Sequence, residues 1–156
     1  MRALICDDNE DMCKILSVLI EKSYPSSKTQ IAYTGMKCLE IAKDFYPDII
    51  ILDIRLPDLL GYKVCEELRM CERTRDSGII MLTGYAQDDS VRKKAMESEA
   101  DAFLVKPVER YQVISQINLV LKAKKLVVKT PSYSKNNLQQ LRNLTHQAFN
   151  DKKEMI

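Results

Sequence analysis

The chain has 156 residues, a formal net charge of +2 and 46% hydrophobic residues, which is enough for one self-supporting domain with an additional segment. The amino terminus lacks the order of a signal peptide and no apolar run is long enough to span a bilayer, so we expect a soluble cytoplasmic protein with no membrane partner. The charge is divided unevenly, because residues 122–156 carry eight Lys or Arg and two Asp or Glu, whereas residues 1–121 are net acidic.

The cysteines form no pattern that predicts disulfides or a metal site. Their number, five, is odd, and no two of them have C-x-x-C spacing. They lie in apolar or helical contexts, which favours free thiols in a reducing compartment. These residues are Cys6, Cys13, Cys38, Cys65 and Cys71.

Short apolar segments alternate with segments of helical periodicity. The predicted strands cover residues 2–6, 28–33, 48–52, 78–82 and 102–105. The predicted helices contain the apolar set between 12 and 20, residues 35–45, residues 62–71, a polar segment from capping residues at 88–90 through 97, and residues 109–122. Five strand–helix units in succession predict an α/β fold with right-handed crossovers and one parallel sheet covered by helices on both faces.

One predicted strand is apolar without alternation. Residues 49–52 read Ile-Ile-Ile-Leu, which is typical of a strand covered on both faces. Asp53 follows at the carboxyl end of this strand. In open α/β sheets, ligands bind outside the carboxyl ends of the strands. Asp53 is therefore expected at a ligand site.

Polar side chains also follow the other predicted strands, and the ends of neighbouring parallel strands share one edge of a sheet. Three carboxylates about 4–5 Å apart would repel by roughly 3–4 kcal/mol per pair at an effective dielectric of about 20, so a divalent cation or protonation must offset the repulsion. Oxygen ligands that leave room for water favour Mg²⁺ over Ca²⁺. The residues at these strand ends are Asp7, Asp8, Asp53, Thr83 and Lys106.

The order of these residues matches a known family. The set consists of Asp7, Asp8, Asp53, Thr83, Phe103, Lys106 and Pro107. In this order on five strand–helix units it closely resembles the receiver domain of two-component response regulators, over about residues 1–122. The resemblance implies a flavodoxin-like, doubly wound sheet of strand order 2-1-3-4-5. Residues 123–156 would then be a basic linker and a short amphipathic helix, with no recognisable output domain.

The resemblance implies that Asp53 accepts a phosphoryl group from a sensor histidine kinase or a histidine phosphotransfer protein. Asp8, Asp53 and the backbone carbonyl of Arg55 would bind Mg²⁺, and Asp7 would reach the ion through water. An acyl phosphate hydrolyses without help, so its lifetime would be the lifetime of the signal. The protein would be a signalling switch rather than an enzyme, although it would assist its own phosphoryl transfer.

Four more positions take roles from the same resemblance. Lys106 would pair with Asp53 or a phosphoryl oxygen, and the peptide bond to Pro107 would be cis. The Thr83 hydroxyl would bind another phosphoryl oxygen, and the Phe103 ring would fill the space that Thr83 leaves. An unknown downstream protein would read the change on the surface formed by the fourth helix, the fifth strand and the fifth helix, and the family leaves open a homodimer on phosphorylation.

Two further positions set the rate of dephosphorylation in the resemblance. Arg55 lies two residues beyond the phosphoacceptor, and Tyr85 lies two residues beyond the threonine. Neither side chain is an acid or an amide that could orient an attacking water, and both are bulky. The resemblance therefore implies a phosphoryl group that is lost slowly.

Other interpretations of the chain are open. Taken singly, Asp7 and Asp8 could cap a helix, and Asp53 could be a turn residue. A relay shuttle that passes the phosphoryl group on would look the same as a terminal switch. An aspartate-nucleophile phosphatase would carry the sequence pattern D-x-D, whose second acid is the general acid. Arg55 occupies that second position here, so no general acid is in place. An interaction module that keeps the fold without the chemistry is a third alternative, disfavoured by the intact acidic set.

The carboxyl-terminal part gives less information. Residues 122–129 are basic, residues 130–132 read Thr-Pro-Ser, and residues 137–149 show roughly helical apolar spacing. A solvated linker with a short amphipathic helix is the main interpretation, and nucleic-acid binding by the lysines is the minor one. His146 is the single histidine, and its surroundings do not resemble a kinase histidine.

Overall fold

The computed structural model of the chain describes residues 1–84 and 89–129. Its strands are β1 (Arg2–Cys6), β2 (Lys28–Ala32), β3 (Ile49–Asp53), β4 (Gly78–Thr83) and β5 (Ala102–Val105). Its helices are α1 (Glu10–Ser23), α2 (Gly35–Phe45), α3 (Gly61–Met70), α4 (Asp89–Glu97) and α5 (Arg110–Lys129). The predicted alternation of strand and helix is confirmed, and strand ends differ from the prediction by at most one residue.

The five strands form one parallel sheet of order β2-β1-β3-β4-β5, which confirms the expected topology. The order reverses between β1 and β3, so the carboxyl ends of these two strands flank a crevice. In the register of β3 with β4, Asp53 lies opposite Leu82. Thr83 is thus one residue beyond the neighbour of Asp53 on the same sheet edge.

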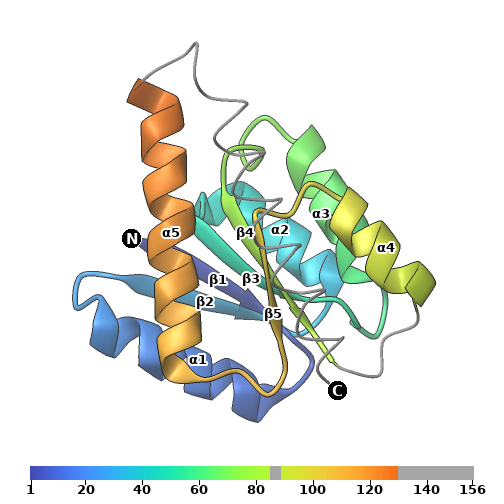
Figure 1. Ribbon diagram of the computed structural model, residues 1–156, viewed down its shortest axis with the longest axis horizontal. Coiled ribbons are helices and arrows are strands. Elements are labelled where there is room, and N and C mark those ends of the chain that lie inside the picture. The colour runs from blue at the N-terminus through green and yellow to red at the C-terminus, as the bar shows by residue number, and fades with distance from the viewer. Residues whose placement is uncertain (85–88, 130–156) are drawn as a thin grey trace.

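Helices cover both faces of the sheet, with α1 and α5 on one face and α2, α3 and α4 on the other (Figure 1). Alternate strand residues therefore enter two separate apolar layers: Ile49 and Ile51 pack with α1 and α5, and Ile50 and Leu52 pack with the other three helices. All residues of β3 are buried, as the absence of alternation in its sequence predicted.

Local capping explains where two of the helices begin. Asn9 precedes α1, and its side chain accepts a hydrogen bond of 2.9 Å from the Met12 amide. Thr34 precedes α2, and its hydroxyl accepts one of 3.1 Å from the Lys37 amide. These short polar side chains satisfy amides that have no partner within the helix.

The predicted end of the last helix is wrong. We expected it at residue 122, but α5 continues to Lys129. Ala123 is buried against the sheet, and Lys124 Nζ lies 3.3 Å from Asp101 Oδ2, so packing continues beyond the predicted end. Lysines are also favourable in the last turns of a helix. The expected tail helix at residues 137–149 lies outside the described residues.

In the described part of the chain, no helix combines the length and apolar character that crossing a bilayer requires. The five cysteines are free thiols, and four of them are buried in the apolar layers.

Candidate functional site

The turns that follow β1, β3 and β5 bring four charged side chains together. Carboxylate oxygens of Asp7, Asp8 and Asp53 all lie within 4.8 Å of one another. Lys106, which follows β5, reaches the same place. The convergence that the strand ends predicted is therefore observed for these four residues.

The Lys106 ammonium lies between two of the carboxylates. Its Nζ is 2.7 Å from Asp7 Oδ2 and 3.3 Å from Asp53 Oδ1. The other oxygen of Asp7 accepts a hydrogen bond of 2.9 Å from the backbone amide of Asn9. The fully buried Asp7 side chain is thus held from both sides, which is how proteins keep a buried charge in place.

Burial raises the pKa of Asp53 to about 6; the positive charge of Lys106 opposes this shift, whereas the negative charge of Asp7 adds to it. Burial has the opposite effect on the lysine, but the hydrogen bond to Asp7 and the charges of Asp53 and Asp7 outweigh it and raise the pKa of Lys106. The lysine is therefore charged at neutral pH, and Asp53 is mostly ionised.

The donor set suits a magnesium ion. It consists of oxygen atoms only, it carries three formal negative charges against one lysine, and Asp8 is exposed, so water can complete the coordination. Hard oxygen donors with room for water are what Mg²⁺ prefers in proteins. The raised pKa of Asp53 means that its ionised form is disfavoured by burial, so a cation beside it would stabilise the carboxylate.

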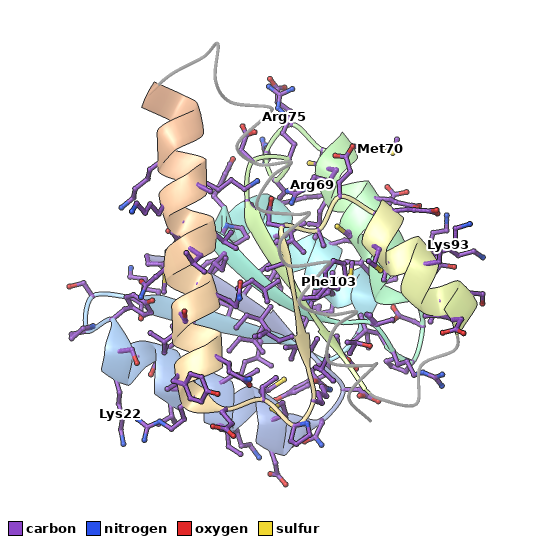
Figure 2. All side chains as sticks on the ribbon, viewed as in Figure 1. Lys22, Arg69, Met70, Arg75, Lys93 and Phe103 are labelled. Atoms are coloured by element: carbon purple, nitrogen blue, oxygen red, sulfur yellow. The ribbon has the colours of Figure 1, made fainter. Side chains whose placement is uncertain are left out.

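Thr83 ends β4 and Phe103 lies in β5, the two strands that follow β3 in the order of the sheet. Thr83 is fully buried, and its hydroxyl donates to the Gly84 carbonyl at 3.3 Å. Phe103 lies opposite Met81 in the sheet and is only 6% exposed. Figure 2 shows Phe103 on the side of β5 that faces α4, in the layer that also contains Ala95.

The other expected positions lie at the rim of the site. Arg55 is exposed and forms an isolated antiparallel bridge with Leu60. The Lys106–Pro107 peptide bond is cis, the isomer that the resemblance led us to expect. Tyr85 lies outside the described residues.

Sequence reasoning missed three residues that shape the site. Asn9 could have been found, because asparagine before a helical segment is a typical helix start. Gly61 could not, since a Cβ added there would lie 2.2 Å from the backbone oxygen of Asp53, a contact seen only in three dimensions. Asp58 could not either: its carboxylate accepts hydrogen bonds from the amides of Gly35 and Met36, at 2.7 and 2.8 Å, on another part of the chain.

The fold and the site define a flavodoxin-like α/β protein with an acidic, lysine-bearing site at the carboxyl edge of its sheet. A family model described as the response regulator receiver domain matches residues 3–118. The chain belongs to this family, and it is therefore a signalling domain of two-component systems. Domains of this family are generally not classed as enzymes, and the family implies interaction with histidine kinases and downstream effectors.

Individual relatives agree with the family. The chain is 33% identical over 122 residues to the DNA-binding dual master transcriptional regulator RpaA of Synechocystis sp., a match that covers 78% of this chain and 49% of that protein. The chain thus spans about half the length of this curated relative.

Solved structures show the same fold. A CheY-like receiver domain protein from Methanospirillum hungatei has a TM-score of 0.72 at 25% identity, covering 80% of this chain and 95% of that chain. The receiver domain of a signal transduction histidine kinase from Syntrophus aciditrophicus has a TM-score of 0.71 at 25% identity, covering 78% and 89%.

Proposed function

We propose that this receiver domain is a phosphorylation-activated switch in which Asp53 accepts the phosphoryl group with the help of Mg²⁺. The observation that supports this most strongly is the cluster itself: a buried carboxylate at the end of the central strand, two further carboxylates within 4.8 Å, and an ammonium 3.3 Å away. Three carboxylates with one ammonium repel one another and lower stability, so this arrangement is not explained by a contribution to folding.

The chemistry needs positioning and charge neutralisation. An Asp53 oxygen attacks the phosphorus of a phosphohistidine, and the P–N bond breaks with its electron pair passing to the imidazole nitrogen of the donor. Asp53 is mostly ionised at pH 7, so no general base is required. A bound Mg²⁺ would neutralise charge on the phosphoryl oxygens, and Asp8, Asp53 and the carbonyl of Arg55 would hold it, with Asp7 reaching it through water.

Lys106 contributes the second positive charge. It is closest to Asp7 and within ion-pair distance of Asp53, so it can follow the charge that arrives on Asp53 without a large movement. A fixed ammonium beside developing negative charge stabilises the transition state and costs no reorganisation.

Thr83 and Phe103 would carry the signal to the surface. A phosphoryl oxygen would compete with the Gly84 carbonyl for the Thr83 hydroxyl, and the space left by Thr83 would stabilise the inward position of the Phe103 ring. The ring is already only 6% exposed, so the phosphoryl group would fix a position that the ring holds beforehand rather than bring the ring in from the surface. The partner would read the α4–β5–α5 surface.

Labelling with acetyl phosphate tests the proposal. We expect wild-type protein with Mg²⁺ to acquire a phosphoryl group and the Asp53→Ala variant to acquire none. Failure of wild-type protein to acquire a phosphoryl group would indicate a domain that keeps the fold without the chemistry. Sustained turnover of a small phosphate ester would instead favour a phosphatase.

A further inference from the structure

Asp58 ties the loop that follows the phosphoacceptor strand to a helix from another part of the chain. This loop, residues 54–60, leads from Asp53 to α3. The Asp58 carboxylate accepts the amide of Gly35 through Oδ1 at 2.7 Å and the amide of Met36 through Oδ2 at 2.8 Å. Oδ1 also accepts the amide of Leu59 at 2.9 Å. Both oxygens are therefore engaged, two amides belonging to α2 and one to the loop.

The beginning of α2 needs this carboxylate. The hydroxyl of Thr34 satisfies the amide of Lys37, and α2 has no acidic residue in its own first turn. The amides of Gly35 and Met36 have no partner within the helix, and the positive end of the helix dipole favours an anion there. Slight burial raises the pKa of the Asp58 carboxyl group, but the hydrogen bonds from the amides of Met36, Gly35 and Leu59 outweigh it and lower the pKa. This is expected for an ionised cap.

The base of the same loop is fixed against the site. The Ile54 amide donates to Leu82 on β4 at 3.0 Å, and the Gly61 amide donates to the Ile54 carbonyl at 2.7 Å. Gly61 is packed so closely that an added Cβ would lie 2.2 Å from the backbone oxygen of Asp53. A shift of the loop would therefore be passed directly to the peptides that follow Asp53.

We propose that Asp58 is a positioning residue for the cation site: by fastening the tip of the loop to α2, it holds the peptides after Asp53 where a magnesium ion can be bound. The inference rests on the function proposed above. Asp58 does not touch the ion or the phosphoryl group. It acts through the loop that carries the carbonyl of Arg55, and outer residues of this kind are known to tune metal affinity.

Magnesium affinity, measured by calorimetry without a phosphoryl donor, tests this directly. We expect Asp58→Ala to raise the dissociation constant for Mg²⁺ by about threefold to tenfold, which is below the roughly 10–100-fold typical of residues that contact a metal ligand directly, because Asp58 acts through the loop. Asp58→Asn keeps one acceptor and should fall between Asp58→Ala and wild type. Labelling by acetyl phosphate should need correspondingly more Mg²⁺ in Asp58→Ala but reach about the wild-type rate at saturation, because the remaining ligands are intact.

Thr34→Ala is the matched control. It removes a cap from the same helix without touching the loop, so a role limited to helix stability would make both variants behave alike. We expect Thr34→Ala to lower thermal stability and leave magnesium affinity unchanged. Unchanged affinity in a folded Asp58→Ala protein, or an equal loss in Thr34→Ala, overturns the inference.

Circular dichroism at the assay temperature shows whether each variant is folded. Should Asp58→Ala unfold, Asp58→Asn decides: weaker magnesium binding supports the inference and wild-type binding overturns it. Asp53→Ala separates the two proposals. If wild-type and Asp53→Ala proteins are labelled equally, the proposed function fails. If only wild type is labelled while the Asp58 variants bind Mg²⁺ normally, only the positioning role fails.

Discussion

Lys106 Nζ lies 2.7 Å from Asp7 Oδ2, closer than its distance of 3.3 Å to Asp53 Oδ1. The lysine is thus held chiefly by Asp7, which follows β1, and only secondarily by Asp53. This arrangement leaves Asp53 with an incomplete neutralisation of its charge, and it places an ammonium beside the position that a phosphoryl group would take. The consequences can be measured.

Replacing Lys106 should slow phosphorylation strongly. Lys106→Met keeps an unbranched side chain that ends where the ammonium begins, so the charge that develops on the phosphoryl oxygens loses a fixed partner while the packing of the stem is kept. We expect the labelling rate from acetyl phosphate to fall by about 10²–10³-fold, as for the loss of a preorganised donor. The rate at saturating Mg²⁺ is the measurement, and Lys94→Met, on the surface of α4, is the control. A fall of less than a few fold would contradict this role.

The raised pKa of Asp53 makes stability depend on pH. In the folded protein this pKa is about 6, against an ordinary value of 3.8 for an aspartate, so the folded state holds the proton more tightly than the unfolded state. The stabilising contribution is present below about pH 4 and is lost as the pH rises to about 6 and above. Asp53→Asn should remove this loss and increase the free energy of unfolding at pH 7 by on the order of 2–3 kcal/mol without Mg²⁺.

Urea unfolding at pH 5 and pH 7 checks that prediction. The difference between Asp53→Asn and wild type should be larger at pH 7 than at pH 5, and Mg²⁺ should reduce it. Asp44→Asn, an exposed acid on α2, is the control. An equal difference at both pH values would show that the ionisation of Asp53 is not its cause.

Magnesium should stabilise the folded protein through the acidic cluster. A ligand that binds only the folded state stabilises it by about 2.7 kcal/mol at one hundred times its dissociation constant. Asp8 is exposed, so Asp8→Ala should leave the fold intact and remove most of the effect. Thermal unfolding with and without MgCl₂ measures it, with Asp11→Ala as control. Equal stabilisation of wild type and Asp8→Ala would place the ion elsewhere.

Gly61 should tolerate no side chain. A Cβ there would lie 2.2 Å from the Asp53 backbone oxygen, whereas a Cβ at Gly84 meets no atom of residues 1–84 or 89–129 within 4 Å. We expect Gly61→Ala to destabilise the protein by about 1–3 kcal/mol or more, as overpacking does. It should also impair labelling, because the shift reaches the backbone of Asp53, the proposed phosphoacceptor. Gly84→Ala is the matched control, and similar stability of the two variants in urea unfolding would contradict the packing argument.

The lifetime of the phosphoryl group should respond to two substitutions together. Arg55→Asn and Tyr85→Glu introduce side chains that can orient water. We expect the half-life of the phosphoryl group to shorten by about tenfold or more, although by less than the roughly hundredfold that a well-positioned general base contributes. Loss of label after removal of the donor is the measurement. An unchanged or longer half-life in the double variant would show that these positions do not set the decay rate.

Much of the fold could be predicted because its signals are local in sequence. The unbroken apolar run of residues 49–52 indicated a strand covered on both faces, and the alternation of strands and helices indicated a parallel sheet. The convergence of Asp7, Asp8, Asp53 and Lys106 also followed, since it requires only that strand ends share an edge. The roles assigned to these four residues, like those assigned to Thr83, Phe103, Arg55 and Tyr85, stay predictions.

The parts that could not be predicted depend on contacts between distant segments. Asp58 caps a helix that begins 23 residues earlier, and nothing in its own turn indicates that partner. The extent of α5 was underestimated because the basic run after residue 122 suggested a solvated linker. The buried Ala123 and the ion pair of Lys124 with Asp101 continue the helix instead.

Direct identification of the phosphorylated residue tests the central claim. Wild-type protein labelled by acetyl phosphate with Mg²⁺ can be reduced with borohydride, which converts an aspartyl phosphate to homoserine, and then mapped by tandem mass spectrometry. We predict homoserine at position 53 alone, dependent on Mg²⁺ and absent without the donor. Reduction at another aspartate with position 53 unchanged, or labelling that survives intact in Asp53→Ala, would contradict it.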